Sequence, residues 1–211
     1  MAVLVLVRHA VTDQTGKRLY GQRPGIHLSA RGRDQSEEVA RRLSGLPIAA
    51  VYSSPLERCV ETAEPIAGAL GLEVQPDPRL LETDMGAWTG KTFGQVRRAR
   101  LWSRILAVPS STRFPDGESL AEVQARAVAA VESIGARHGN GHAVVVSHGD
   151  PIRLVLAHYA GLHLDLFQRL EVAPASVSMV ATGEHGPRLL RLNDTGSLDL
   201  AGPRGGRMRR R

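Results

Sequence analysis

Three short apolar runs along the chain have the pattern of strands that are buried on both faces of a sheet. Residues 3–7 alternate valine and leucine without a polar position, and similar runs lie at residues 48–52 and 142–147. Aliphatic runs of this length are typical of a parallel sheet that is covered by helices. Two later segments, 175–181 and 188–192, predict a hairpin at the edge of the same sheet.

Segments with helical spacing separate these runs. Ser29 is a good N-cap for a helix that stops at residues 45–47, which read Gly-Leu-Pro. Ser54 is expected to cap a second helix, with Pro55 at its first position, that runs to about Leu70.

The second half of the chain predicts two more helices. Asp116 is expected to cap a long helix over residues 118–137, where apolar residues recur at a helical period. A fourth helix is expected from Asp150 to about Ala160, closed by Gly161. Alternating strands and helices with short connections predict an α/β fold, a three-layer α/β/α sandwich around a mostly parallel central sheet.

The chain has 211 residues, of which 42% are hydrophobic, so it is long enough for one domain with a sizeable core. We expect that domain to cover residues 1–192. Residues 193–211 are rich in Gly, Pro and Arg without periodicity, and we expect a disordered tail there. Two long irregular stretches, 10–28 and 81–92, lie inside the domain, and loops of that length are often functional.

The net charge of +6 comes almost entirely from the end of the chain. The last eleven residues hold five arginines and no acid, so the remainder carries 6 − 5 = +1. A terminal cluster is not a basic groove, and 4% aromatic residues are too few for a base-stacking surface. We therefore expect no specific nucleic-acid partner. The five arginines are Arg204, Arg207, Arg209, Arg210 and Arg211.

Cysteine content and hydropathy indicate in which cellular compartment the protein works. The apolar runs are far shorter than the ~20 residues that cross a bilayer, and the chain starts without the basic segment of a signal peptide. The single cysteine, Cys59, excludes an internal disulfide and a cysteine-cluster metal site. We expect Cys59 to be a small residue on a helix face rather than a catalytic thiol. The sequence predicts a cytoplasmic protein without a membrane partner.

Residues suited to binding an anion follow the ends of the predicted strands. Arg8 and His9 come directly after the first strand, and His148 follows the strand at 142–147. Arg58 lies in the first part of the helix after the second strand. Because parallel strands end at one edge, these groups are expected to meet there, beside a helix N-terminus.

Each of these features has an ordinary structural explanation when it is taken alone, since a histidine at a strand end is often a satisfied structural group. Together they are more specific. Two imidazoles and two guanidiniums at one sheet edge require an anion to balance them. A phosphoryl group, with three equatorial oxygens, meets that requirement.

Four blocks of the sequence resemble the histidine phosphatase (phosphoglycerate mutase-like) superfamily, in its branch of phosphatases with an Arg-His-Gly motif. Residues 7–10 read Val-Arg-His-Ala, and residues 53–63 read Ser-Ser-Pro-Leu-Glu-Arg-Cys-Val-Glu-Thr-Ala. Residues 81–90 and the Val-Ser-His-Gly of 146–149 complete the set. The match covers roughly residues 3–192, in the order and spacing of the family.

The resemblance implies a role for each site residue. His9 would be the nucleophile that takes up the phosphoryl group, and Arg8, Arg58 and His148 would form the phosphate pocket. Glu82 would be the proton donor; Asp84, two residues away, is the alternative from chemistry alone. The family needs neither a metal nor an organic cofactor, and the sequence has no His-x-x-x-His or paired cysteines.

Several positions around these motifs are less decided. Thr15 stands where many family members have an Asn that touches the phosphate. We expect Thr15 and Gly149 to be candidate substrate contacts. Ala10 stands where the family has Gly. Asp150 could orient His148 or cap the helix that follows, and we favour the cap. Residues 114–119 resemble a Gly-Glu-Ser segment at the mouth of the family's site, although a turn and a helix cap explain them equally well.

Two other functions compete with a phosphatase acting on a small phosphorylated metabolite. A phosphoglycerate mutase would share the histidine chemistry, but this chain lacks that enzyme's Glu-Arg-His-Tyr-Gly segment and its longer basic insertion. A non-catalytic anion-binding protein would not need the complete set of groups. The substrate and the oligomeric state stay open, with a homodimer as one alternative. Specificity is expected to come from Arg18, Tyr20, Arg23, Trp88 and residues 91–115, and an arginine run at 97–104 either lines the entrance or is an exposed helix face.

Overall fold

A six-stranded sheet forms the centre of the computed structural model, which describes residues 2–183 and 186–196. The strand order is β3-β2-β4-β1-β5-β6. The four strands on one side of the sheet, β3, β2, β4 and β1, run parallel, and β5 and β6 continue it antiparallel. The strands are β1 (Ala2–Arg8), β2 (Ile48–Ser53), β3 (Val74–Pro76), β4 (His142–Ser147), β5 (Val177–Thr182) and β6 (Arg188–Asp194).

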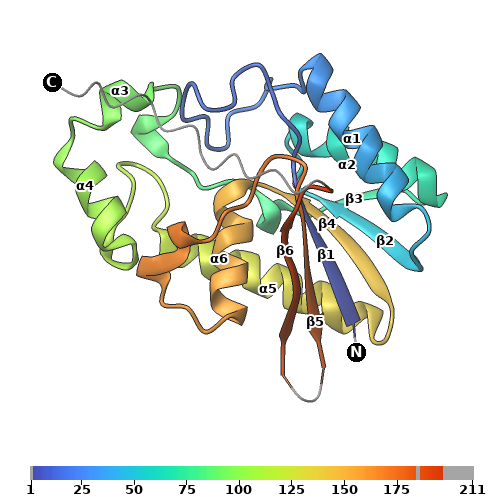
Figure 1. Cartoon of the computed structure of the whole chain (residues 1–211). Helices are drawn as coiled ribbons and strands as arrows, with labels where there is room; N and C mark the ends of the chain where they lie inside the picture. Colours follow the sequence, from blue (N-terminus) through green and yellow to red (C-terminus); the bar gives the residue numbers. More distant parts are fainter. Residues whose placement is uncertain (1, 184–185, 197–211) are drawn as a thin grey trace, which may run out of the picture.

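Four helices cover the two faces of this sheet (Figure 1). On one face lie α1 (Ala30–Leu43) and α2 (Glu57–Leu70), packed on Val5 and Val7 of β1. On the other lie α5 (Leu120–His138) and α6 (Gly149–Tyr159), packed on Leu4 and Leu6. Alternate residues of one strand therefore serve opposite cores, which explains its unbroken apolar run. The predicted three-layer fold is confirmed.

A smaller lobe extends the molecule beyond the carboxyl ends of the parallel strands (Figure 1). It contains the short helices α3 (Phe93–Val96) and α4 (Arg100–Ala107) and has an apolar cluster of its own, which includes Leu19, Trp88, Phe114 and Phe167. Short 3₁₀ helices connect it to the sheet. These are η1 (Pro78–Leu80), η2 (Gly86–Trp88), η3 (Pro109–Ser111) and η4 (Leu164–Arg169).

The helix caps differ from the sequence predictions at three of the four predicted helices. Ser29 caps α1 as expected, with its side chain accepting from the Gly32 N–H. Ser54 does not cap α2, because its N–H still donates to Val146 beside the sheet and its hydroxyl lies 2.8 Å from Nε2 of His148. The helix begins at Glu57 instead, with Leu56 at the N-cap position.

The predicted cap of α5 is also wrong. Asp116 has a φ of 57° and belongs to a turn. Ser119 caps the helix, and a capping box joins it to Glu122. The same correction applies to α6, which begins at Gly149 with His148 at the N-cap, so that Asp150 lies inside the first turn without capping it.

The ends of the sheet also depart from the prediction. Strand β3, whose three residues end in a proline, was not predicted. The last strand, β6, continues to Asp194, two residues beyond its predicted end, because it pairs with β5 as far as Val177, which lies opposite Asp194. Arg42 of α1 also forms an ion pair with Asp194 at 2.7 Å. Most of the expected tail, residues 197–211, lies outside the described residues. Within the described part of the chain, no helix has the length and apolar character needed to cross a membrane.

Candidate active site

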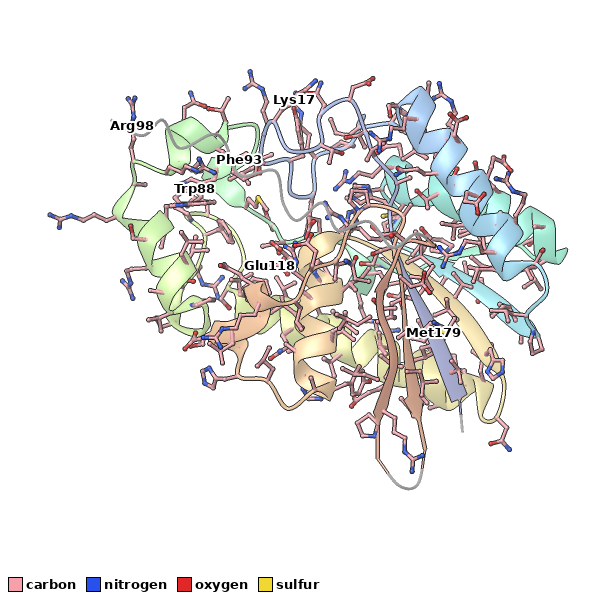
Figure 2. The ribbon with its side chains drawn as sticks, viewed as in Figure 1. Lys17, Trp88, Phe93, Arg98, Glu118 and Met179 are labelled. Carbon is pink, nitrogen blue, oxygen red and sulfur yellow. The ribbon has the colours of Figure 1, made fainter. Side chains whose placement is uncertain are left out.

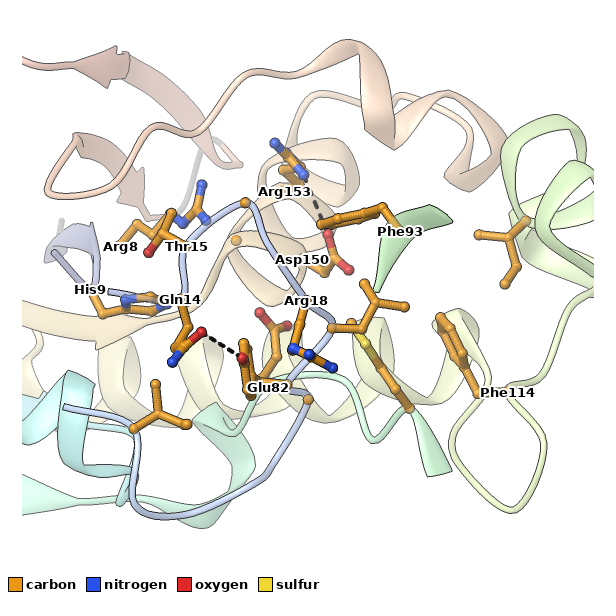
Figure 3. Close-up of a pocket in the computed structure, with 18 of the residues that line it drawn as sticks. Arg8, His9, Gln14, Thr15, Arg18, Glu82, Phe93, Phe114, Asp150 and Arg153 are labelled. Atoms are coloured by element: carbon orange, nitrogen blue, oxygen red, sulfur yellow. Dashed lines mark hydrogen bonds and ion pairs between the residues drawn. The ribbon is translucent and has the colours of Figure 1, made fainter. Parts of the chain in front are cut away.

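A cavity of about 390 Å³ opens at the carboxyl edge of the parallel strands. The end of β1 contributes Arg8 and His9, the loop at 10–28 contributes one wall, and the loop at 81–92 contributes Glu82 and Met85. Figure 3 shows these groups around the cavity, with His9 at one side and Phe93 and Phe114 at the other. Charged residues and aromatic residues therefore share one cavity.

His9 is held at the end of β1 by its backbone and by its ring. Its N–H donates to Ser147 of the neighbouring strand β4 at 2.9 Å, and Nδ1 lies 2.8 Å from the carbonyl of Ala10. A carbonyl can only accept, so Nδ1 carries the proton and Nε2 has a free lone pair. Burial, reinforced by Arg8 and Arg58, holds the pKa of His9 well below its usual range, which keeps the ring neutral.

His148 lies next to His9, with ring centroids 5.2 Å apart. Its side chain is fully buried, and Nε2 contacts the hydroxyl of Ser54 at 2.8 Å. The sulfur of Cys59, on the buried face of α2, lies 3.4 Å from the same nitrogen. Burial and the nearby Arg58 lower the pKa of His148, so this ring is also neutral. Cys59 is a small buried residue as expected, and burial raises the pKa of its thiol.

Two guanidiniums lie beside the histidines. Arg58, only 3% exposed, donates to the carbonyl of Gly21 at 2.8 Å, which ties it to the first long loop. Arg8 donates to the carbonyl of Val172 at 2.6 Å, and its buried Nε has no hydrogen-bond partner among residues 2–183 and 186–196. A buried cationic donor without a partner is costly, and an anion in the cavity would satisfy it.

Glu82 lies in the second long loop and lines the same cavity. Burial, together with the nearby carboxylate of Asp150, raises the pKa of Glu82 to about 7. A carboxyl group in that environment keeps its proton into the neutral range and can act as an acid. Asp84, the alternative acid, faces elsewhere: its carboxylate accepts from the Gly86 N–H at 2.9 Å.

An ion pair fixes the backbone that carries Glu82. Arg126 of α5 binds both carboxylate oxygens of Glu118, at 2.7 and 2.8 Å, and also donates to the carbonyls of Arg79, Leu81 and Glu82. Glu118, labelled in Figure 2, in turn accepts from the Asp84 N–H at 2.8 Å. We call this pair the Arg126–Glu118 clamp. Glu118 of the Gly-Glu-Ser segment thus holds the loop that carries Glu82 through Arg126, and Ser119 of the same segment caps α5.

The two less decided candidates both lie at the cavity. Thr15 lines it, and its hydroxyl accepts from the Thr12 N–H at 2.9 Å. Gly149 packs against Arg8 so closely that a Cβ there would lie 3.3 Å from the guanidinium carbon. Gly149 therefore leaves room for the Arg8 side chain.

The structure adds lining residues that the sequence analysis did not single out. Arg153 lines the cavity and faces Asp150 at 3.4 Å on the same side of α6, one helical turn apart. The spacing of three residues on a helix that begins at the site could have indicated this pair. Gln14, in the first long loop, lines the cavity without any sequence signal.

The expected specificity residues divide into two groups. Arg18 and Tyr20 line the cavity, as do several residues of the 91–115 segment. Trp88 lies behind the wall, with its ring 5.6 Å from Phe114, and Arg23 is an exposed residue whose carbonyl accepts from Arg58. The arginines at 97, 98, 100 and 104 are exposed on the lobe; Figure 2 shows Arg98 pointing outward.

Among the described residues, no three His, Cys, Asp or Glu side chains gather as metal ligands would. The cavity instead offers a neutral imidazole, guanidiniums and a carboxyl group whose pKa is raised to about 7. Taken with the doubly covered sheet, these groups define an α/β protein with a pocket at the carboxyl edge of its sheet that two buried arginines make cationic. Residues 4–195 match the histidine phosphatase superfamily (branch 1), and the chain belongs to that family.

Proteins similar to this chain include several phosphatases. It is 35% identical to phosphoserine phosphatase 1 of Hydrogenobacter thermophilus over 92% of this chain and 93% of that protein. Its structure matches Bacillus stearothermophilus YhfR with a TM-score of 0.86 and 27% identity, covering 92% of this chain and 98% of the other. A mycobacterial glucosyl-3-phosphoglycerate phosphatase matches with a TM-score of 0.81 and 28% identity, over 91% and 98% of the two chains.

Proposed function

We propose that this protein is a metal-independent phosphatase that hydrolyses a small phosphomonoester through a phosphohistidine on His9. The observation that carries the proposal is the hydrogen bond from Nδ1 of His9 to Ala10, which leaves Nε2 free on a neutral ring. Nε2 is then available to attack phosphorus in line with the leaving oxygen. The similarity to characterised phosphatases supports the same reaction.

The first step transfers the phosphoryl group to the enzyme. The bond between Nε2 of His9 and phosphorus forms as the bond from phosphorus to the ester oxygen breaks. Arg8 and Arg58 hold the equatorial oxygens, and Thr15 and the N-terminus of α6 at Gly149 are further contacts. His148, which lies beside His9 but outside the cavity lining, joins them when its Nε2 leaves the hydroxyl of Ser54. Positioned donors of this kind stabilise the charge of the transition state. Glu82 gives its proton to the departing alkoxide, so the alcohol leaves neutral.

The second step releases phosphate and restores the enzyme. Glu82, now a carboxylate, takes a proton from a water molecule as that water attacks the phosphohistidine. The bond between phosphorus and nitrogen breaks, and its electron pair returns to Nε2 of His9. Inorganic phosphate leaves, and Glu82 is protonated again for the next turnover. No metal or organic cofactor enters this scheme.

The test is phosphate release from p-nitrophenyl phosphate in the presence of EDTA. Wild-type protein is expected to be active, and His9→Ala is expected to lose at least about a thousandfold in kcat/KM. His158→Ala, at an exposed histidine on α6, is the matched control and keeps full activity. Wild-type activity in folded His9→Ala protein would refute the phosphohistidine, and activity that EDTA abolishes would refute the metal-independent route.

A mutase would pass the phosphoryl group from His9 back to a second phosphoester instead of to water. That reaction requires cations for a second phosphate. Within the described residues, the arginines at 97–104 lie outside the cavity, whereas Arg18 and Arg153 line it and are the cations that a second phosphate could use. A parallel assay with 3-phosphoglycerate and 2,3-bisphosphoglycerate separates the two reactions, and interconversion without phosphate release would favour the mutase.

A further inference from the structure

Arg153 of α6 is a partly buried cation in the cavity wall whose hydrogen-bonding capacity is not filled. Its Nη1 donates to Asp150 at 3.4 Å, which is long for a hydrogen bond, and Nη2 lies 3.8 Å from Glu171, beyond hydrogen-bond distance. Its buried Nε has no partner anywhere in the described part of the chain. This guanidinium therefore has N–H groups left for a ligand.

Arg126 shows what a structural arginine of the same burial looks like in this protein. The two side chains are 19% and 22% exposed, for Arg126 and Arg153 respectively. Arg126 makes hydrogen bonds of 2.7–2.9 Å to Glu118 and to three loop carbonyls. A guanidinium that is taken from water without such partners is costly. Arg153 bears that cost at the wall of a cavity, where a bound anion would offset it.

The position of Arg153 relates it to the phosphate pocket. It follows Gly149 by one helical turn, a rise of about 6 Å along α6, and helical side chains tilt back toward the N-terminus. Its charge is felt at Arg8, because burial and then the charge of Arg153 lower the pKa of Arg8. Two cations that repel each other across one cavity favour a ligand with two anionic groups, of which the phosphoryl group is one.

The charges around Arg153 favour a carboxylate as the second anionic group. Asp150 and Glu171 already offset part of the positive charge there, so a group with one negative charge fits better than a phosphate with two. The two oxygens of a carboxylate also match the parallel N–H groups on one edge of a guanidinium. Arg18, which donates to the carbonyl of Gly90 from an exposed position, lines the same cavity and adds a further positive charge.

Apolar side chains of the small lobe surround these charged groups. Phe93, Trp102, Ile105 and Phe114 line the cavity, and we call them the apolar wall. In the view of Figure 3, Arg153 and Asp150 lie between His9 and the two phenylalanines. A charge-assisted hydrogen bond beside apolar surface is stronger than one in water, because less solvent screens it. The apolar wall therefore strengthens a contact between Arg153 and a carboxylate.

We propose that Arg153 binds a carboxylate on the leaving alcohol, so that the preferred substrates are phosphomonoesters of short hydroxy acids. A chain of two or three carbons, including that of the carboxylate, matches one helical turn between the phosphate pocket and Arg153. The proposal rests on the proposed function, because a phosphoryl group at His9 fixes where the alcohol lies. Arg153 is then a specificity-determining residue that does not touch the reacting atoms.

Three phosphate esters of one chain length test this proposal. The phosphate of 3-hydroxypropanoate, propyl phosphate and 1,3-propanediol bisphosphate differ only at the far end of the chain, in a carboxylate, a methyl group or a second phosphate. For the wild type, kcat/KM is expected to be about thirtyfold higher for the carboxylate ester than for propyl phosphate. The bisphosphate is expected to fall between them. Initial rates of phosphate release measure all three.

Substitutions of Arg153 locate the effect. Arg153→Gln is expected to lower the carboxylate-to-methyl ratio of kcat/KM about thirtyfold, and Arg153→Lys to retain part of it, since a lysine keeps the charge without the paired N–H groups. The ratio excludes an effect through Glu82, which would slow both esters equally. Arg169→Gln is the matched control, because it removes the same charge from an exposed position outside the cavity wall, and it is expected to keep the wild-type ratio.

The outcomes separate this proposal from the proposed function. Equal kcat/KM for the carboxylate and methyl esters, or an unchanged ratio in Arg153→Gln, would overturn the carboxylate site and leave the phosphatase in place. A bisphosphate that is hydrolysed faster than the carboxylate ester would overturn it in favour of a second phosphate. No hydrolysis of any phosphate ester by the wild type would refute the phosphatase itself, and the proposal with it.

Discussion

Burial sets the charge of the groups that we propose to react. It lowers the pKa of His9 and of His148, so both rings are neutral, and it raises the pKa of Glu82 to about 7, so this carboxyl is protonated in slightly acidic solution. The guanidiniums of Arg8 and Arg58 stay charged in the same environment because arginine does not lose its proton in proteins. One cause, desolvation, therefore keeps the two imidazoles neutral and the carboxyl group of Glu82 largely protonated below about pH 7, as the proposed nucleophile and acid require.

The raised pKa of Glu82 predicts a pH profile. A proton donor must be protonated, so kcat/KM of the wild type is expected to fall as pH rises through about 7. Glu82→Gln is expected to lose about a hundredfold in kcat/KM and to show no such fall. Rates at constant ionic strength between pH 5 and 9 measure both. A wild-type profile that is level across this range would contradict the assignment of Glu82.

The same group links pH to stability. The pKa of Glu82 is 4.5 in its ordinary state and about 7 in the folded protein. Its contribution to the free energy of unfolding is therefore complete below about pH 4.5 and is lost as pH rises through about 7. Between pH 5 and pH 8 the wild type should lose more stability in urea than Glu82→Gln does, and an identical change in the two proteins would show that the carboxyl is not desolvated.

At the scale of elements, the Arg126–Glu118 clamp joins α5 to the loop that carries Glu82. Arg126→Met is expected to lower the free energy of unfolding by about 2 kcal/mol, since a partly buried carboxylate and several carbonyls lose their donor. It should also lower kcat about tenfold while the inhibition constant of inorganic phosphate stays unchanged, because the acid moves and the phosphate pocket does not.

Arg113 gives the matched control for this prediction. It also pairs with a glutamate, Glu122, but both side chains are more than half exposed. Arg113→Met is expected to change stability by less than about 1 kcal/mol and to leave kcat unchanged. Arg126→Lys should recover part of the lost kcat. Equal effects of the Arg126 and Arg113 substitutions would show that the clamp does not position Glu82.

The sequence predicted those elements whose signals are local. Strands β1, β2 and β4 were found because a strand covered on both faces has no polar positions, and α1 was found with its cap, Ser29. The cap of α2 was wrong because the hydroxyl of Ser54 has His148, at the N-cap of α6, as its partner, and only the folded chain brings these residues together. Strand β3 was missed because three residues are too few to show a period.

In the candidate site, too, the residues with a local sequence signal were predicted and those that depend on the folded chain were not. The sequence predicted the residues that follow strand ends or belong to a motif, because both features can be recognised in the sequence itself. The cavity is lined by Arg8, His9, Arg58, Glu82 and Gly149, and His148 lies beside His9. The role of Arg126 was not predicted. Its partners include backbone carbonyls of a loop, and every residue has such a carbonyl, so the sequence does not show which ones a side chain will bind. The apolar wall was expected only as a segment, because the sequence does not tell which face of a short helix points inward.

At the scale of the whole molecule, the positive charge is concentrated at the C-terminal end of the sequence. All five arginines of the last eleven residues lie outside the described part of the chain, and the rest carries a net charge of only +1. Truncation after Asp199 is therefore expected to abolish retention on heparin at low salt while leaving phosphatase activity unchanged. Chromatography and the p-nitrophenyl phosphate assay measure the two properties. Retention that is the same after truncation would place the heparin-binding surface on the body.

The position of β1 in the sheet has a consequence during synthesis. β1 pairs with β4 on one side and β5 on the other, so Val3 meets His142 and Ala181. At bacterial or eukaryotic rates of translation, on the order of 10 s pass between the appearance of the first strand and that of its first partner. For that time one of the most apolar segments of the chain is exposed on the ribosome. Strand β1 is therefore a natural binding site for chaperones until β4 has been made, and fragments that end before residue 142 should aggregate.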